Sequence, residues 1–209
     1  MTVCVKICGI TSPEQALMAQ RAGADALGLV IYSKSSRHVD MQRAAEIRQQ
    51  IGESVLAVAL LVNADRTQVE QVITEVKPDV LQFHGDETPE FCQQFNFPFI
   101  RAIRMREGLD LDAEVAAYQA PGGFLFDAWS ADQYGGTGHR FDWNRLPSHR
   151  DYPLILAGGL TPQNVASAVQ LVAPDMVDVS GGVESAPGIK DPVKVAEFIN
   201  QAKLAAVGL

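Results

Sequence analysis

The sequence lacks any apolar run long enough to cross a membrane. Its longest runs, such as Val55 to Val62, fall far short of the roughly 20 residues that a membrane-spanning helix needs. The N-terminal segment also lacks the pattern of a secretory signal, because its early positive charge, Lys6, interrupts the apolar stretch instead of preceding it. We therefore expect a protein of the cytoplasm.

Positive charge and cysteine are both scarce. The chain has 17 Lys and Arg against 25 Asp and Glu, a formal net charge of -8. Such a chain repels nucleic acid and anionic membranes at long range, so neither is expected as a partner, and an anionic ligand must be held by local positive groups. The three cysteines do not suggest a disulfide framework, and Cys4 and Cys8 do not have the spacing of a zinc-binding C-x-x-C. We expect reduced thiols.

Hydrophobic residues are plentiful, at 47% of the chain. Short apolar runs alternate with amphipathic stretches rich in Ala, Glu and Gln from one end to the other, which is typical of repeated βα units around a parallel sheet. Three Pro-containing pairs, Ser12-Pro13, Thr161-Pro162 and Asp191-Pro192, are predicted to open helices. The predicted strands span Val3–Cys8, Ala24–Ile31, Val55–Val62, Val80–His84, Phe99–Ile103, Phe124–Asp127, Leu154–Ala157 and Met176–Ser180.

Eight βα units in 209 residues predict an α/β protein, a single-domain (β/α)8 TIM barrel with a parallel eight-stranded core that spans residues 1–209. This length lies near the lower limit for that fold. An open doubly wound sheet would show the same composition, so it remains an alternative at this point. A barrel would place its active site at the carboxyl ends of the strands.

Side chains alternate along a strand, so inward and outward residues can be predicted. Lys6 and Cys8 share the polar face of the first strand, opposite its apolar face. Asp127 lies opposite two Phe side chains at the end of the sixth strand, and Asp178 and Ser180 lie opposite two Val side chains in the eighth. We therefore expect Cys8, Asp127 and Asp178 to point towards one mouth of the barrel.

Five short motifs at the predicted strand ends occur in a specific order along the chain. They are Lys6-Ile7-Cys8-Gly9, Leu81-Gln82-Phe83-His84-Gly85, Asp127 followed by Gly135-Gly136-Thr137-Gly138, Leu156-Ala157-Gly158-Gly159-Leu160, and Asp178-Val179-Ser180. The series resembles the phosphoribosylanthranilate isomerase family of tryptophan biosynthesis over nearly the whole chain. Three positions depart from the family's usual pattern, which has an aromatic residue at Leu29, proline at Ser36 and serine at Gly181.

The resemblance implies an Amadori rearrangement, in which N-(5-phosphoribosyl)anthranilate becomes 1-(2-carboxyphenylamino)-1-deoxyribulose 5-phosphate without a metal or redox cofactor. Such chemistry needs a general acid to open the ribose ring and a general base to remove the C2 proton. By resemblance, Asp127 is the acid and Cys8 is the base. A phosphorylated aminosugar is then the small-molecule partner, and we expect the active protein to be a monomer.

Both catalytic assignments have structural alternatives. A free thiol titrates near about 8.5, so Cys8 must be partly deprotonated to act as a base, and Lys6 on the same face would assist. Taken alone, Cys8 would be read as a small buried apolar residue, the usual role of a free cysteine. Asp127 would be read as a strand-end carboxylate that caps a loop amide. His84 is inward, and a polar-core or supporting role fits it better than a catalytic one.

The binding residues are predicted mainly from glycines and the family pattern. Phosphate is expected at Gly158, Gly159, Ser180, Gly181 and Gly182, because main-chain N–H groups approach an anion closely where no Cβ intervenes, although tight turns also favour such pairs. By resemblance, the loop arginine binds the anthranilate carboxylate, Asp178 binds a substrate hydroxyl or is structural, and the glycine-rich loop closes over the sugar phosphate. The residues in those three roles are Arg37, Asp178 and Gly136. Taken alone, Arg37 would be read as an exposed loop charge and Gly136 as part of an ordinary flexible connection.

Two rival functions remain open on the sequence. One is another sugar-phosphate barrel enzyme, such as the related indole-glycerol-phosphate synthase, although that chemistry needs a set of Lys and Glu residues of which Lys6 alone is not enough. The other is a non-catalytic phosphate-binding barrel, in which Cys8→Ala and Asp127→Asn would leave ligand binding intact and there would be no turnover to lose.

Overall fold

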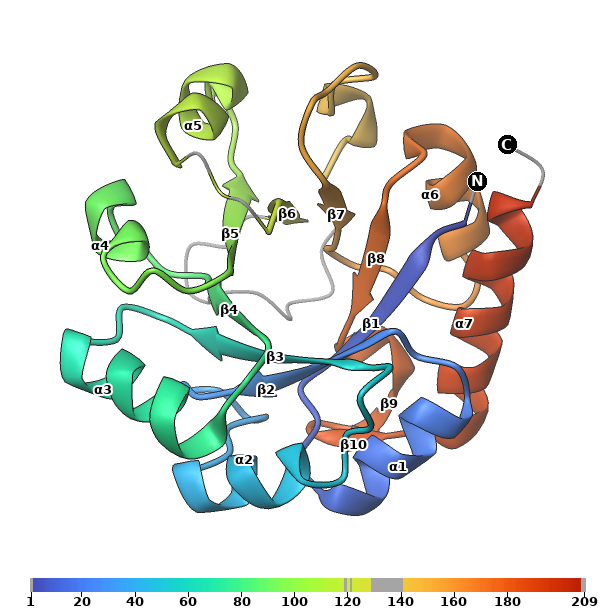
Figure 1. Ribbon diagram of the computed structural model, residues 1–209. Helices are drawn as coiled ribbons and strands as arrows, with labels where there is room; N and C mark the ends of the chain where they lie inside the picture. Colours follow the sequence, from blue (N-terminus) through green and yellow to red (C-terminus); the bar gives the residue numbers. More distant parts are fainter. Residues whose placement is uncertain (1, 119, 121, 129–140, 208–209) are drawn as a thin grey trace.

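The computed structural model describes residues 2–118, 120, 122–128 and 141–207. Eight parallel strands pair in chain order around a closed barrel, and helices cover its outside (Figure 1). The first and last strands pair with each other, so the prediction of a closed barrel is confirmed and the open doubly wound sheet is excluded. The strands are β1 (Cys4–Cys8), β2 (Ala26–Val30), β3 (Leu56–Leu61), β4 (Val80–Phe83), β5 (Phe99–Met105), β6 (Phe124–Ala128), β7 (Leu154–Leu156) and β8 (Met176–Val179).

The α-helices follow the barrel strands in the chain, and three short helical turns and a hairpin complete the described fold. The α-helices are α1 (Pro13–Arg21), α2 (Met41–Arg48), α3 (Arg66–Gln71), α4 (Pro89–Gln93), α5 (Leu111–Tyr118), α6 (Val165–Val172) and α7 (Pro192–Ala206). A π-helical turn, η1 (Val72–Val76), continues α3, and 3-10 turns form η2 (Trp143–Arg145) and η3 (Gly181–Val183). Beyond β8, a small antiparallel hairpin joins β9 (Glu184–Ala186) to β10 (Ile189–Lys190). No helix in the described part of the chain is long and apolar enough to span a membrane.

Two of the three predicted helix starts are confirmed. Ser12 and Asp191 cap α1 and α7, and in each helix a proline occupies the first turn, where its missing N–H costs nothing. The prediction for Thr161-Pro162 is wrong, because α6 begins only at Val165. The Asn164 side chain accepts from the Thr161 N–H and donates to the Gly159 carbonyl, and these local bonds hold the preceding residues in a turn.

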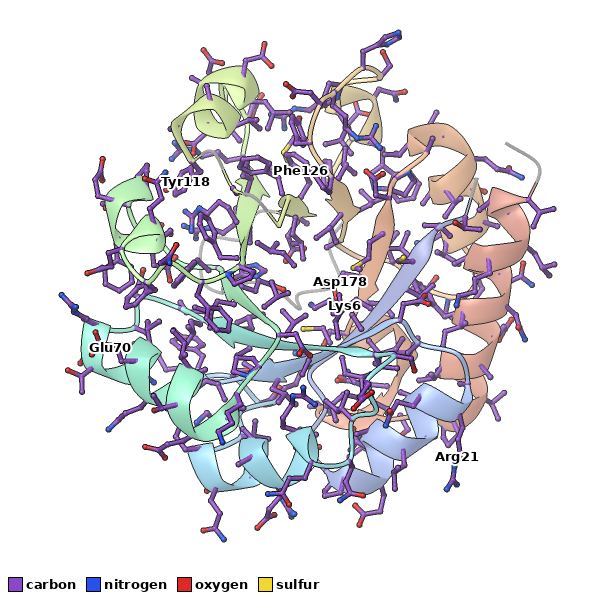
Figure 2. All side chains as sticks on the ribbon, in the orientation of Figure 1. Lys6, Arg21, Glu70, Tyr118, Phe126 and Asp178 are labelled. Carbon is purple, nitrogen blue, oxygen red and sulfur yellow. The ribbon has the colours of Figure 1, made fainter. Side chains whose placement is uncertain are left out.

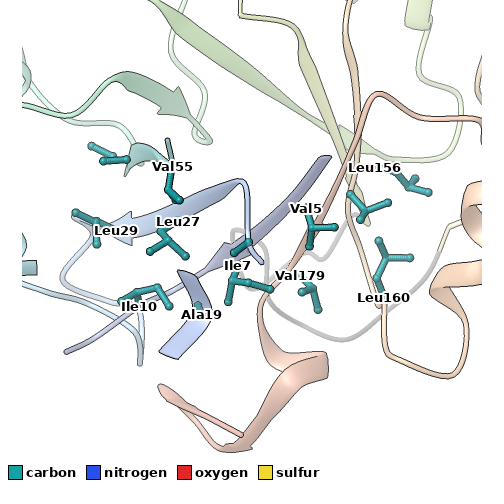
Figure 3. Packing of buried hydrophobic residues seen from close by; sticks show 14 of the residues in the cluster. Val5, Ile7, Ile10, Ala19, Leu27, Leu29, Val55, Leu156, Leu160 and Val179 are labelled. Atoms are coloured by element: carbon teal, nitrogen blue, oxygen red, sulfur yellow. The ribbon is translucent and has the colours of Figure 1, made fainter. Parts of the chain in front are cut away.

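The predicted alternation of side chains is also confirmed. Apolar residues of β1, β2, β7 and β8 that face away from the barrel axis pack under the helices, where Ile7 and Leu27 lie close to Ala19 of α1 (Figure 3). On β6, Phe124 stacks edge-on against Tyr152 outside the barrel, with ring centroids 5.1 Å apart. The barrel interior is filled by a separate apolar layer of mostly small and branched side chains, which are Ala26, Val58, Ile100, Ala102, Leu125, Ile155 and Ala157. Polar residues at the carboxyl ends of the strands therefore rest on a packed floor.

Candidate active site

A cavity of about 230 Å³ opens at the carboxyl ends of β6, β7 and β8. It collects residues from the sixth, seventh and eighth predicted units, and most of the predicted site residues are among them. The lining residues are Asp127, Ala157, Gly158, Gly159, Leu160, Asp178, Val179, Ser180, Gly181 and Gly182. The structure thus brings together two carboxylates and both glycine pairs, whereas Gly136 lies outside the described residues.

Backbone geometry requires glycine at three positions of this cavity, Gly158, Gly159 and Gly182. Gly158 and Gly159 have φ angles of +83° and +63°, in the left-handed region that favours glycine. A Cβ on Gly182 would lie 1.9 Å from the carbonyl oxygen of Leu160, so no other residue fits there without a shift of the backbone. The loops after β7 and β8 therefore touch each other through main-chain atoms, and the short η3 turn begins beside them. This is the arrangement in which many (β/α)8 barrels hold a phosphate.

Asp127 is buried at the end of β6, and both of its carboxylate oxygens have neighbours. Oδ1 accepts from the N–H of Ala128 at 2.8 Å, which is the local amide contact that the structural alternative predicts. Oδ2 lies 3.3 Å from Nε2 of His84, which comes from the end of β4. The amide of Gln82 in turn contacts Nδ1 of that imidazole at 2.9 Å. His84 and Gln82 thus form a polar pair beside Asp127, although Nε2 of His84 makes no hydrogen bond within the described part of the chain.

Lys6 is fully buried in the barrel and forms an ion pair with Asp178, with 2.9 Å between Nζ and Oδ1 (Figure 2). Burial alone would lower the pKa of Lys6, but the Asp178 carboxylate and the Cys8 side chain outweigh it and raise the pKa. Lys6 therefore stays charged in the barrel core. The charge of the Asp178 carboxylate in the cavity is consequently balanced by Lys6.

Cys8 lies at the end of β1 on the inner face, as predicted, in a small apolar cluster with Val30, Leu60 and Val62. Gly28 on the neighbouring strand leaves room for the thiol, because a Cβ there would come within 2.7 Å of Sγ. Burial raises the pKa of the Cys8 thiol, and the nearby Lys6 reduces that increase without cancelling it. Cys8 is thus a protonated thiol in the free protein at neutral pH, and the assistance expected from Lys6 is only partial.

Arg37 is held at the mouth by a residue that the sequence did not single out. Its Nε and Nη2 atoms donate to the two carboxylate oxygens of Glu184, each at 2.8 Å, so the exposed loop charge offered by the structural alternative is excluded. Lys190 donates to the same carboxylate at 2.7 Å. Glu184 and Lys190 lie on β9 and β10, and the Pro187-Gly188 pair between them is a turn signal that could have indicated this hairpin.

In the part of the chain that the structure describes, no group of three or more His, Cys, Asp or Glu side chains could hold a metal ion. The barrel mouth thus contains the Asp127 carboxyl group, the Cys8 thiol, three basic side chains paired with two carboxylates, and two glycine-rich loops. The fold and this set of groups define a (β/α)8 barrel of the class that binds phosphorylated small molecules and catalyses acid–base chemistry on them.

Comparison with known proteins agrees with this class. Residues 5–201 match the model of the N-(5'-phosphoribosyl)anthranilate (PRA) isomerase family. The chain is 48% identical over 197 residues to N-(5'-phosphoribosyl)anthranilate isomerase of Neisseria gonorrhoeae, covering 94% of this chain and 95% of that protein. It is 49% identical over 198 residues to the enzyme of the same name from Stutzerimonas stutzeri, covering 95% and 96% of the two chains.

Solved structures show the same relationship. The crystal structure of phosphoribosyl anthranilate isomerase from Thermotoga maritima has a TM-score of 0.88 and 36% identity, and covers 99% of this chain and 100% of that chain. A structure of the same kind of enzyme in complex with reduced 1-(o-carboxyphenylamino)-1-deoxyribulose 5-phosphate has a TM-score of 0.82 and 34% identity, with the same coverage. The chain belongs to the N-(5'-phosphoribosyl)anthranilate isomerase family.

Proposed function

We propose that this protein isomerises N-(5-phosphoribosyl)anthranilate to 1-(2-carboxyphenylamino)-1-deoxyribulose 5-phosphate in tryptophan biosynthesis. The observation that carries the proposal is the cavity in which Asp127 faces the glycine-rich loops after β7 and β8. In this cavity a carboxyl group lies next to the glycine loops, since a Cβ on Gly158 would lie 3.1 Å from Oδ1 of Asp127, and loops at these positions hold the phosphate in many (β/α)8 barrels. A relative of 34% identity has been solved with the reduced form of this product, which supports the choice of substrate.

Asp127 is proposed as the general acid. Its proton passes to the furanose ring oxygen, the bond from that oxygen to C1 breaks, and the nitrogen lone pair forms a C1 iminium. The Ala128 N–H donates to Oδ1, and Nε2 of His84 lies 3.3 Å from Oδ2, so the carboxyl group has polar neighbours on both oxygens. Removal of the carboxyl group is expected to stop ring opening.

Cys8 is proposed as the general base. It takes the C2 proton of the iminium, and the released electron pair forms an enolamine, which becomes the ketone when C1 gains a proton and the C2 hydroxyl loses one. The thiol must first release its own proton to the solvent, and the positive charge of the iminium favours the thiolate at that step. Lys6 and Lys190 act in the same direction, because both lower the pKa of Cys8 against the effect of burial.

The remaining predicted residues are proposed to bind the substrate. The phosphate is placed on main-chain N–H groups of the two glycine loops and on Ser180, and Arg37 receives the anthranilate carboxylate. Asp178 is proposed to contact a sugar hydroxyl through Oδ2, while Lys6 donates to Oδ1. Gly136 stays a prediction. All of these groups come from one chain, so we propose that the monomer is sufficient for activity, to be checked by light scattering of the active protein.

The experiment is to follow the decay of anthranilate-type fluorescence when purified protein is added to phosphoribosylanthranilate made in the cuvette. Cys8→Ala and Asp127→Asn are expected to abolish the protein-dependent decay while the far-ultraviolet circular dichroism stays that of the folded protein. Cys4→Ala is the matched control, because Cys4 lies at the opposite end of β1 and is exposed. Folded protein that gives no decay above the spontaneous rate would contradict the proposal and favour the non-catalytic phosphate-binding barrel.

A further inference from the structure

We infer that Glu184 and Lys190, on the hairpin after β8, are positioning residues that hold the Arg37 guanidinium at the mouth and thereby determine specificity for a substrate that carries a carboxylate. The inference rests on the proposed function, in which Arg37 receives the anthranilate carboxylate. It adds two residues and a specificity mechanism to that function, and it is carried by the geometry of the three side chains.

Glu184 binds the Arg37 guanidinium through both of its carboxylate oxygens. The carboxylate occupies the Nε and Nη2 side of the guanidinium with two bonds of 2.8 Å. A planar fork held on one side by a bidentate carboxylate has its plane and direction fixed, because rotation would break both bonds at once. Among the described residues, no protein group bonds to Nη1, so the opposite side of the fork is available to a second carboxylate.

The Arg37 side chain lies close to Gly9 and Ser180 at the barrel mouth. The aliphatic part of Arg37 crosses directly over Gly9, the residue that follows Cys8, since a Cβ on Gly9 would lie 2.5 Å from Cδ of Arg37. The same Cβ would lie 3.1 Å from Oγ of Ser180, at the edge of the phosphate cradle. Arg37 therefore lies between the proposed base and the glycine loop after β8, where a ligand that spans the mouth must pass.

Arg37, Glu184 and Lys190 form a largely buried charged cluster. The Lys190 side chain is fully buried, and Nζ donates to Glu184 at 2.7 Å and to the carbonyl oxygen of Ser180 at 3.1 Å. One carboxylate is thus shared by two basic side chains. Burial lowers the pKa of Lys190, and the Glu184 carboxylate opposes that effect. A negatively charged group is favoured beside these basic side chains. Lys190 also keeps Glu184 from turning away, because one carboxylate oxygen is shared between the two cations.

Hydrogen bonds to a neighbouring part of the chain hold the hairpin that carries Glu184 and Lys190. The carbonyl oxygen of Gly188 accepts from Oγ1 of Thr11 at 2.7 Å and from Nε2 of Gln15 at 3.1 Å. Gly188 has a φ of +79°, so the tight turn depends on glycine. The hairpin is therefore hydrogen-bonded to the loop between β1 and α1 and to the first turn of α1, which holds Glu184 in place relative to Cys8.

The test measures kcat and KM for two substrates, phosphoribosylanthranilate and the corresponding phosphoribosylamine of aniline, which lacks the carboxylate. The variants are Glu184→Gln, Arg37→Ala and the double variant, with Lys194→Gln as the matched control. Nζ of Lys194 donates to the main-chain oxygen of Glu184, so this variant tests the position of the hairpin without touching the carboxylate. Glu184→Asp, which retains the charge beside Lys190 but shortens the side chain, replaces Glu184→Gln should that variant fail to fold.

We expect Glu184→Gln to raise KM for phosphoribosylanthranilate by about tenfold or more, the loss that corresponds to weakening a charged hydrogen-bonded contact. The loss for the aniline substrate is expected to be smaller by a similar factor. In the Arg37→Ala background, Glu184→Gln should change KM no further, because its effect passes through Arg37. Equal losses for both substrates, or full additivity in the double variant, would overturn the inference in favour of a purely structural ion cluster. An inactive wild-type protein would instead overturn the proposed function.

Discussion

Lys6 and Asp178 are direct neighbours across the seam where β1 pairs with β8, and their side chains form an ion pair inside the barrel. The pair joins two residues that are 172 positions apart in the chain. It links closure of the barrel to the site, because Asp178 also lines the cavity. The ionic contact thus lies between the packed core below and the reacting groups above.

Removal of Lys6 is expected to cost more than removal of any surface lysine. In Lys6→Met the Asp178 carboxylate stays buried without its partner, and breaking a buried pair in this way costs about 3–5 kcal/mol of the free energy of unfolding. The measurement is urea unfolding followed by circular dichroism. Lys34→Met is the control, since Lys34 is exposed, and it should stay within about 0.5 kcal/mol of the wild type. Equal stability of the two variants would show that the pair contributes nothing.

Gly182→Ala is expected to damage the cavity through the backbone. The new Cβ would overlap the carbonyl oxygen of Leu160, so one of the two loops must move, at a cost of about 1–3 kcal/mol in stability. The same shift should raise KM for the phosphorylated substrate and inhibition constants for inorganic phosphate. Gly52→Ala serves as the control, because its Cβ would meet only a side-chain oxygen at 3.4 Å. Unchanged phosphate binding in Gly182→Ala would remove this loop from the phosphate site.

His84→Phe is expected to reduce kcat by about tenfold or more and to leave KM nearly unchanged. The ring still fills the space, but Asp127 loses the polar neighbour that lies 3.3 Å from Oδ2. Steady-state kinetics on phosphoribosylanthranilate separates the two constants. His149→Phe is the control on an exposed histidine and should match the wild type. A variant with a raised KM and an unchanged kcat would instead place His84 in substrate binding.

Alkaline pH is expected to destabilise the protein partly through Cys92 on α4. Burial raises the pKa of this thiol to about 12, with Arg101 acting in the opposite direction. Between the pKa of a free thiol, about 8.5, and that value, the unfolded chain has lost a proton that the folded chain keeps, so the free energy of unfolding falls as pH rises. Cys92→Ala should flatten this dependence between about pH 9 and pH 11 in urea titrations, and an unchanged slope would contradict the prediction.

Much of the fold follows from local sequence patterns. Eight apolar runs with turn signals between them predict eight strands, because backbone alternation and helix capping depend on neighbouring residues alone. The same alternation places Cys8, Asp127 and Asp178 on inner faces, and the structure confirms it. The start of α6 was missed, since the Asn164 side chain bonds form a local turn whose choice over a helix depends on the packed loop after β7.

By itself, the sequence determined the repeated βα units, the inward residues and the resemblance of its motifs to one family. Only the tertiary structure decided that β8 returns to β1, that the pKa of Cys8 is raised, and that Arg37 is gripped by Glu184, which is 147 positions away. Each of these depends on groups that are distant in the chain, and burial and charge pairing exist only after the barrel has closed. Short-range patterns carry no information on such contacts.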